Sequence, residues 1–245
     1  MSLRVLVSFV FFCLAWATPA FAGVIAIANV VAVVGNPTSS GPGGNRTLAA
    51  GNAIFENDKI TVTSGNAQIL FLDGTKLVVG PSSALVINKY LMRGDGSTAQ
   101  DFSIKALRGT FRFITGTSPK DAYDIQTANA TIGIRGTGFD FWVNDSTSVA
   151  VLNGKVRLKN KLGKHDFVDL NPTCELGTTE NRSAKKMTGE NAGHRLRNHL
   201  PYILDQSKLK KSFWLNLNSC KSALAATEPL SGKGSPEPPA RGGKG

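Results

Sequence analysis

Side chains that bind metals are scarce in this sequence. Its 245 residues include three histidines and three cysteines. His194 and His199 are five residues apart, a spacing that does not place them on one face of a helix. If Cys174 and Cys220 are oxidised, too few ligands remain for a zinc site. The composition therefore argues against a metalloenzyme, and we expect no cofactor.

Catalytic motifs are also missing. The sequence has no Gly-x-Ser-x-Gly segment, the setting of a serine nucleophile. Gly133, Gly136 and Gly138 reverse the dinucleotide-binding spacing and lead into a phenylalanine-rich strand rather than a helix. Carboxylate pairs for glycoside hydrolysis can lie far apart in a chain, so the sequence leaves that one class open. We expect a protein that is not an enzyme.

Long apolar runs are absent after the N-terminus. Residues 5–17 are apolar apart from one serine, follow the single charge of Arg4 and lead to small residues that end at Ala22. This is the layout of a secretory signal peptide, whereas a membrane-spanning helix needs roughly 20 apolar residues. We predict a signal peptide over residues 1–22, cleaved between Ala22 and Gly23, rather than an uncleaved anchor. The mature chain is then expected to be exported.

Acidic residues are outnumbered: 17 Asp and Glu face 28 Lys and Arg, which gives a formal charge of +11. Residues 171–221 hold nine basic residues and four acidic ones, so the excess is concentrated there. Nucleic acid is the usual partner of such charge, but an exported protein rarely meets it. Anionic lipid head groups or acidic envelope polymers fit better through simple electrostatics, and a solvated basic face remains the plain alternative.

The composition and turn residues favour β-structure. Twenty-six glycines and frequent Thr and Val suit strands and turns. Asp73 and Gly74 separate two apolar runs, which is the strongest short-range signal for a β-hairpin, and Gly154 marks another turn. About ten short strands predict an all-β sandwich, roll or short solenoid over residues 23–170. The Gly- and Ser-rich segment 38–47 is predicted to be a loop without strand pairing.

The character of the sequence changes after residue 170. In segment 171–221, Leu196, Leu200 and Ile203 recur at helix-like offsets with basic residues between them. We predict one or two short amphipathic helices, which either cap the β-domain or contact a membrane surface or a partner. Residues 222–245, rich in Pro, Gly and Ser, are predicted to be a disordered tail.

Two cysteines remain once the signal peptide is removed. Cys174 and Cys220 form an even pair, and an exported chain reaches an oxidising compartment. We therefore expect a disulfide between them, with two unrelated thiols as the alternative.

Four segments, in the same order, resemble the motifs of the FecR family and together fall within residues 55–160. They are Gly65–Leu85, Lys105–Phe113, Ala130–Phe141 and Val151–Leu158. The resemblance implies a periplasmic β-domain in a Gram-negative bacterium. Members like the namesake relay the state of an outer-membrane transporter to a cytoplasmic sigma factor, through a transmembrane helix and a cytoplasmic segment. Here a signal peptide stands where those parts would be, so we expect a stand-alone form.

The resemblance brings no catalytic residues with it, and most of its motif positions are interpreted as structural. They are Asp73, Gly74, Gly80, Ser83, Gly109, Gly133, Arg135, Gly136, Thr137, Phe139 and Gly154. The glycines permit turns and the phenylalanines are candidate core residues. Arg135 is the exception, because it is either a buried tie to strand carbonyls and carboxylates or an exposed ligand contact.

The leading hypothesis is a non-enzymatic periplasmic module for protein interaction, signalling or regulation in the cell envelope. Its exposed strand edges are natural contact surfaces, since an extended segment of a partner can add to a sheet. The alternative is a protein that binds an anionic envelope polymer or lipid, with peripheral membrane contact, through the basic residues of 182–221.

Overall fold

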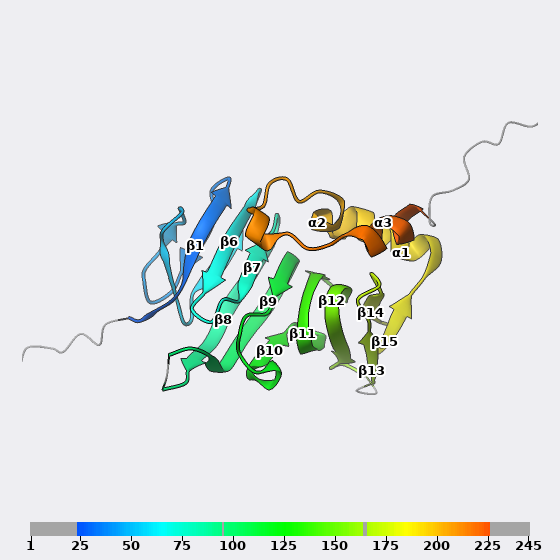
Figure 1. Cartoon of the computed structure of the whole chain (residues 1–245), viewed down its shortest axis with the longest axis horizontal. Coiled ribbons are helices and arrows are strands. Elements are labelled where there is room, and N and C mark those ends of the chain that lie inside the picture. The colour runs from blue at the N-terminus through cyan, green and yellow to red at the C-terminus, as the bar shows by residue number, and fades with distance from the viewer. Residues whose placement is uncertain (1–23, 95, 164–165, 226–245) are drawn as a thin grey trace, which may run out of the picture.

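The structure is a computed structural model that describes residues 24–94, 96–163 and 166–225. Fifteen strands join in one open, mixed sheet (Figure 1). They are β1 (Ala26–Val34), β2 (Thr38–Ser40), β3 (Arg46–Thr47), β4 (Ala53–Phe55), β5 (Lys59–Val62), β6 (Asn66–Phe71), β7 (Lys76–Val79), β8 (Ser83–Met92), β9 (Ala99–Ile114), β10 (Tyr123–Gln126), β11 (Ala130–Val143), β12 (Thr147–Asn160), β13 (Phe167–Leu170), β14 (Leu176–Glu180) and β15 (Ser183–Met187).

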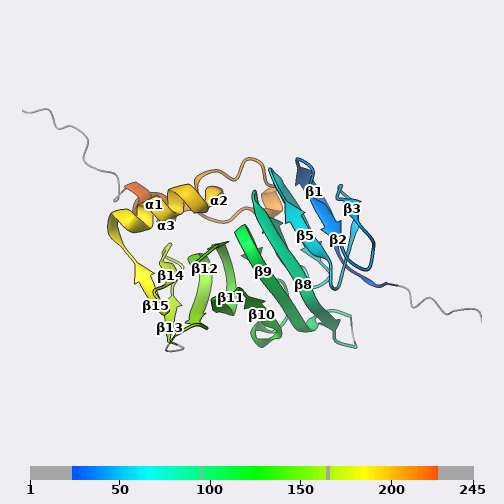
Figure 2. The same ribbon diagram turned by 180° about the vertical axis from the view of Figure 1, so that it is seen from behind.

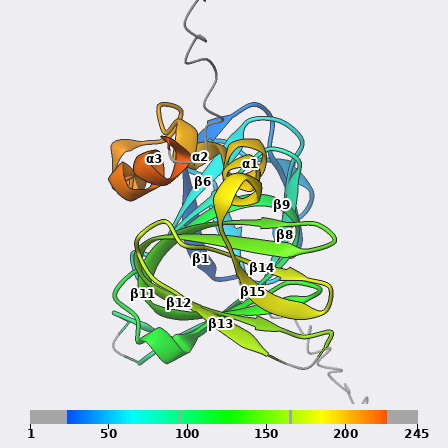
Figure 3. The same ribbon diagram turned by 90° about the vertical axis from the view of Figure 1, so that its right-hand side faces the viewer.

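The main path across the sheet runs β15-β14-β12-β11-β10-β9-β7-β6-β1-β4, with the other strands paired beside it. Strands β9 and β10 are parallel, and the other recorded pairs are antiparallel. Viewed along the long axis of the molecule, the sheet curls around a central core (Figure 3). The all-β class expected from the sequence is confirmed.

The inner face of the sheet carries the main core. Phe102, Phe111, Phe113, Phe139 and Phe141 are almost completely buried there. Successive pairs among them have ring centroids between 4.8 and 5.9 Å apart, the range in which aromatic side chains attract one another. Alternation along each strand directs every second residue into this cluster, which is why the phenylalanines of one strand are two residues apart.

Strands β11 and β12 exchange their inward and outward faces at a bulge. Ile134 is buried before it and Phe139 after it, although the two are an odd number of residues apart. The register shifts between Arg135 and Gly138. Gly136 and Gly154 form the bulge with φ of 65° and 71°, and a Cβ at Gly154 would lie 1.9 Å from the carbonyl oxygen of Gly136. Each strand thus has two outward-facing halves with different surroundings.

The C-terminal segment covers one of these halves (Figures 1 and 2). Its helices are α1 (Gly189–His199), α2 (Pro201–Leu204), the 3₁₀ helix η2 (Lys211–Phe213) and α3 (Asn218–Ala225); another 3₁₀ helix, η1 (Lys120–Ala122), precedes β10. Leu196, Leu200 and Ile203 pack against Ala150 and Leu152, which point outward from β12. The apolar side of this segment therefore acts as a cap on the sheet. No helix in the described part of the chain is long and apolar enough to cross a membrane.

Several boundaries differ from those expected. Segment 38–47 contains β2 and β3, because Thr38–Ser40 pairs with both β3 and β5. Segment 171–221 begins with strands β14 and β15 before its helices. These short strands raise the number from the expected ten or so to fifteen.

The two ends of the chain are only partly described. The predicted signal peptide, with its cleavage site at Ala22 and Gly23, lies outside the described residues. Of the predicted tail, residues 222–225 belong to α3 and the remainder lies outside the described residues.

Candidate functional site

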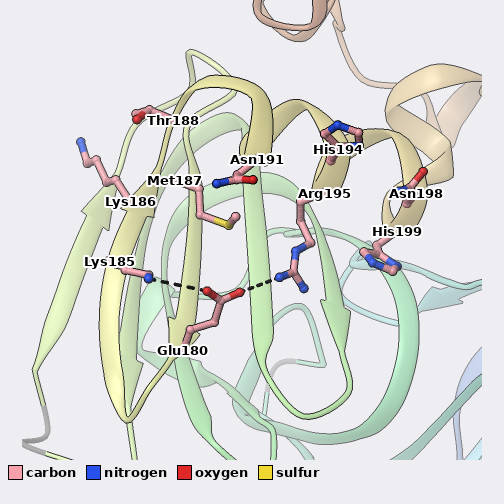
Figure 4. Close-up of a pocket in the computed structure, with 10 residues that line it drawn as sticks. All are labelled: Glu180, Lys185, Lys186, Met187, Thr188, Asn191, His194, Arg195, Asn198 and His199. Atoms are coloured by element: carbon pink, nitrogen blue, oxygen red, sulfur yellow. Dashed lines mark hydrogen bonds and ion pairs between the residues drawn. The ribbon is translucent and has the colours of Figure 1, made fainter. Parts of the chain in front are cut away.

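A polar cleft of about 620 Å³ lies between the β14–β15 hairpin and α1 (Figure 4). Residues 185–188 of β15 and the segment after it line one wall, and residues of α1 from Asn191 to His199 line the other. Polar and charged side chains from both walls point into the space (Figure 4). The cleft therefore suits a charged or hydrogen-bonding partner better than an apolar ligand.

Glu180 connects the two walls. Its carboxylate accepts a hydrogen bond from Arg195 of α1 at 2.5 Å, and the ammonium of Lys185 lies 3.6 Å away on β15 (Figure 4). Because these side chains are partly exposed, each pair contributes at most about 1 kcal/mol to stability. Their effect is mainly positional, since one carboxylate fixes a cation from each wall.

The end of α1 lies against Trp142 of β11. The His199 ring stacks on the indole with centroids 4.0 Å apart, and the Arg195 guanidinium carbon lies 5.0 Å from the same ring. A second hollow, of about 700 Å³, begins on the other side of this contact. Asn198 and His199 line both this hollow and the polar cleft. Burial lowers the pKa of His199, and the charge of Arg195 adds to the effect.

This lowered pKa predicts a loss of stability on mild acidification. Above the ordinary histidine pKa of about 6.5 the ring is neutral in both states. As pH falls below that value, the unfolded chain takes up the proton more readily than the folded one. The free energy of unfolding therefore decreases until the pH has fallen below the lowered pKa of His199 in the folded chain. Urea unfolding between about pH 7.5 and 5 should show a steeper loss in the native chain than in His199→Gln.

His194→Gln is the matched control for this measurement, because His194 also lies on α1 but its side chain is 61% exposed. It should keep the steep loss of the native chain. Identical pH profiles for the native chain and His199→Gln would contradict the prediction.

Strand β15 forms the open end of the sheet beside the cleft and pairs only with β14 among the described strands. Asn181 and Arg182, with φ of 52° and 61°, make a two-residue turn of the primed type. In such a hairpin, alternate residues direct their backbone groups away from the partner strand, here Ala184 and Lys186. Asp166 accepts the Ala184 N–H at 2.9 Å. The backbone of Lys186 is therefore placed at the open edge.

Metal binding finds no support in this region. Across residues 24–225, leaving out 95, 164 and 165, no three His, Cys, Asp or Glu side chains are close enough together to hold a metal ion. Cys174 and Cys220 are joined in a disulfide, with their Cα atoms 4.9 Å apart, which ties α3 to the segment before β14.

Residues 58–157 match the family model described as FecR protein. This stretch is a FecR domain. No curated protein matches the chain. Two crystal structures of a candidate anti-sigma factor from Parabacteroides distasonis ATCC 8503 are similar to it, each at 18% identity, with TM-scores of 0.40 and 0.39. The similarity covers 53% of this chain and 58% of the solved one.

The residues that line the cleft all follow the last matched residue of the FecR domain, because they belong to β14, β15, α1 and the segment between β15 and α1. The domain touches this region through Trp142, which stacks on His199 beside the cleft. The candidate site thus lies in the C-terminal segment, next to the FecR domain.

Within the FecR domain, Asp73 lies at the centre of a buried hydrogen-bond network. Its carboxylate accepts bonds from the Thr75 hydroxyl at 2.8 Å, the Ser118 hydroxyl at 2.6 Å and the Tyr123 hydroxyl at 3.0 Å. Burial raises the pKa of Tyr123 and of Tyr90, with the Asp73 charge acting in the same direction. This arrangement fixes the turn that the sequence predicts there.

The other motif positions of the FecR domain also lie away from the cleft. Four of them, Gly74, Gly109, Gly136 and Gly154, have φ between 65° and 98°. A Cβ on Gly80 would lie 2.8 Å from the Tyr202 hydroxyl. Ser83 Oγ accepts a hydrogen bond from the Thr110 N–H, and the Thr137 hydroxyl donates one to the Asn153 carbonyl. Phe139 is in the core, and Gly133 and Arg135 face outward. Arg135 is exposed, as a ligand contact would be.

Two groups of residues escaped the sequence-based prediction. One is the cleft itself, whose Glu180, Lys185 and Arg195 come from separate elements. The other is the pair Arg112 and Asp140, which lie opposite each other on β9 and β11 and are completely buried under the cap. The available signal was a single charged residue in each of the apolar segments 110–114 and 139–143, which does not reveal what covers them.

Proposed function

We propose that this chain is a non-enzymatic regulatory module of the bacterial cell envelope. In this proposal it is exported to the periplasm and binds a partner protein through the cleft of its C-terminal segment, next to the FecR domain. The partner contributes an extended, acidic segment that lies along the edge of β15 and fills the cleft.

The open edge of β15 is the observation that carries the proposal. Strand addition needs unpaired backbone groups, and Lys186 has its N–H and carbonyl oriented toward solvent. Lysines on an edge discourage indiscriminate pairing between sheets. Lys185 and Arg195 point into the cleft, where Glu180 is the one carboxylate among the described lining residues, so an acidic segment is favoured over a neutral one. Lys186 points away from the cleft (Figure 4) and is paired with Glu175 at 2.7 Å.

The chemistry of the cleft supports a binding role. Glu180 is the carboxylate among the lining residues, and it is already paired with Arg195. His199 is stacked on Trp142 and so is not positioned as the base of a nucleophile. The lipid-binding alternative is weaker, because Leu196, Tyr202 and Ile203 of α1 and α2 are buried and cannot insert into a bilayer, which leaves Leu204 as the exposed leucine of these two helices.

Site-specific photo-crosslinking in cells tests this proposal. A photoreactive residue at Asn191, on the wall opposite β15, should capture one discrete envelope protein. Lys186→Pro removes the edge N–H without disturbing the pairing with β14, so it should abolish that product. Lys186→Gln keeps the N–H and should retain a weaker product. A photoreactive residue at the exposed Lys59 on β5 is the positional control.

The outcomes separate clearly. Equal crosslinking in the Pro and Gln variants would refute binding through the strand edge, and no product at Asn191 would refute a protein partner in the cleft. The chain recovered from the periplasm should begin at Gly23; a retained N-terminus would refute the export step.

A further inference from the structure

The half of the sheet's outer face that the cap leaves uncovered is strongly basic. On the side of the bulge away from the cap, the outward side chains of β11 and β12 include Arg135, Lys155, Arg157 and Lys159. Ile134 and Val156 alternate with them and are buried in the core. We call these four cations, together with Lys120, the basic face.

Like charges oppose one another directly on this surface. Arg135 of β11 and Lys155 of β12 are cross-strand partners. Directly opposed like charges destabilise an antiparallel pair. Lys120 adds to them, because its ammonium would lie 3.6 Å from a Cβ placed on Gly136, the residue after Arg135. The sequence thus accepts a local cost at this point, which is typical of a functional surface.

Among the ion pairs recorded for the described residues, one carboxylate neutralises a cation of this face. Asp169 of β13 binds Arg157 through two hydrogen bonds of 2.8 Å. The pKa of Asp169 is lowered, first by this hydrogen bond and further by the charges of Arg135 and Lys155. Within the described residues no salt bridge is recorded for Lys120, Arg135, Lys155 or Lys159.

The geometry of the basic face is linear. Residues 155, 157 and 159 point the same way along one strand, so their side chains follow one another at about 7 Å. Gly133 lies opposite Arg157 and adds no side chain to the surface between the rows. The result is a row of cations along β12, with Arg135 beside its first member.

We propose that the basic face binds a linear anionic polysaccharide. Negative groups that recur along such a chain match cations that recur along β12, and guanidinium forks bind carboxylates or sulfates well. Residues 156–159 of β12 are already paired with β11 on one side and β13 on the other, so side chains alone must recognise a ligand along this row, which disfavours an added peptide strand. Phe167 is 53% exposed and lies against Arg157, with the guanidinium 4.1 Å from its ring centre.

Heparin, a linear sulfated polysaccharide, is a suitable probe for the full mature chain. The test variant is Arg135→Gln/Lys155→Gln/Lys159→Gln. The matched control is Lys208→Gln/Lys210→Gln/Lys211→Gln, which removes the same charge from exposed lysines of the C-terminal segment. At about 0.15 M NaCl we expect the test variant to lose about tenfold or more in affinity and the control less than about twofold.

Salt dependence and stability give two further measurements. The slope of log affinity against log salt concentration should decrease by roughly 2 to 3 in the test variant, as ionic contacts are lost. Its melting temperature should stay the same or rise, because the opposed pair Arg135 and Lys155 is removed. A folded test variant that binds less heparin therefore supports the proposal.

Four results would overturn it. They are no binding of heparin by the native chain, an equal loss of affinity in both triple variants, tighter binding of polyglutamate than of heparin, and tighter binding of vesicles rich in anionic lipid than of heparin. The third would make the basic face a site for acidic peptides, and the fourth a membrane-contact surface.

Discussion

Replacing Arg112 with methionine should lower the free energy of unfolding by about 3–5 kcal/mol, because it leaves a buried carboxylate without its cation. Arg112 and Asp140 are both fully buried, and they form two hydrogen bonds of 2.6 and 2.8 Å. Burial raises the pKa of Asp140, and the Arg112 guanidinium opposes that rise. Urea unfolding at neutral pH measures the loss.

Arg112 also holds the cap in place. Its guanidinium donates to the carbonyl oxygens of Tyr202 at 3.0 Å and Phe213 at 3.3 Å, and to the side chain of Gln206. The Arg112→Met variant should therefore loosen residues 200–217 in hydrogen exchange before the sheet is affected.

A second substitution separates the charge effect from packing. Arg112→Met/Asp140→Leu removes both charges and should recover a large part of the lost stability, since apolar replacements of buried ion pairs are often close to neutral. The deficit of the single variant should also shrink in acid. Without Arg112 we expect the pKa of Asp140 to rise further, so protonation removes the buried charge as pH falls through it. A double variant as unstable as the single one would contradict this account.

Removing the disulfide should lower stability by about 4 kcal/mol. The bond between Cys174 and Cys220 closes a loop over a sequence separation of 46, and a loop of that length restricts the unfolded chain by roughly this amount. Both cysteines are buried between α3 and the sheet. Cys174→Ser/Cys220→Ser is the variant to compare with the native chain by urea unfolding.

The effect should be concentrated in the cap. We expect faster hydrogen exchange in residues 189–225 of the double serine variant, with protection in β6–β9 retained. Reductant should reproduce this change in the native chain and have no further effect on the variant. Two free thiols in the denatured, unreduced chain would contradict the bond itself.

The sequence predicts the local features of this fold well. Asp73 and Gly74 form the expected turn. Gly74 has a φ of 80°, and glycine adopts such a positive φ without steric cost because it has no Cβ. Alternation identifies Phe111 and Phe113 as core for a similar reason. The resemblance to FecR motifs is confirmed over residues 58–157.

The features that the sequence did not predict depend on distant partners. Thr38–Ser40 is polar and becomes a strand only because β5 lies beside it. Arg112 and Asp140 have the pattern of exposed strand residues until the cap covers them. The cleft has the same origin, since Glu180 and Arg195 belong to a strand and a helix that the sequence placed in one loosely helical segment.

The contacts of Arg112 also set an order of events during folding. Its partners beyond Asp140 lie 90, 94 and 101 residues further along the chain. Closing such long loops is slow, and the strands around Arg112 can pair long before the segment that covers it has been synthesised. We therefore expect the emerging chain to pass through a stage in which the sheet is formed and this ion pair is still open to water. The last residues of the described chain then complete a domain whose first strands lie some 200 residues earlier.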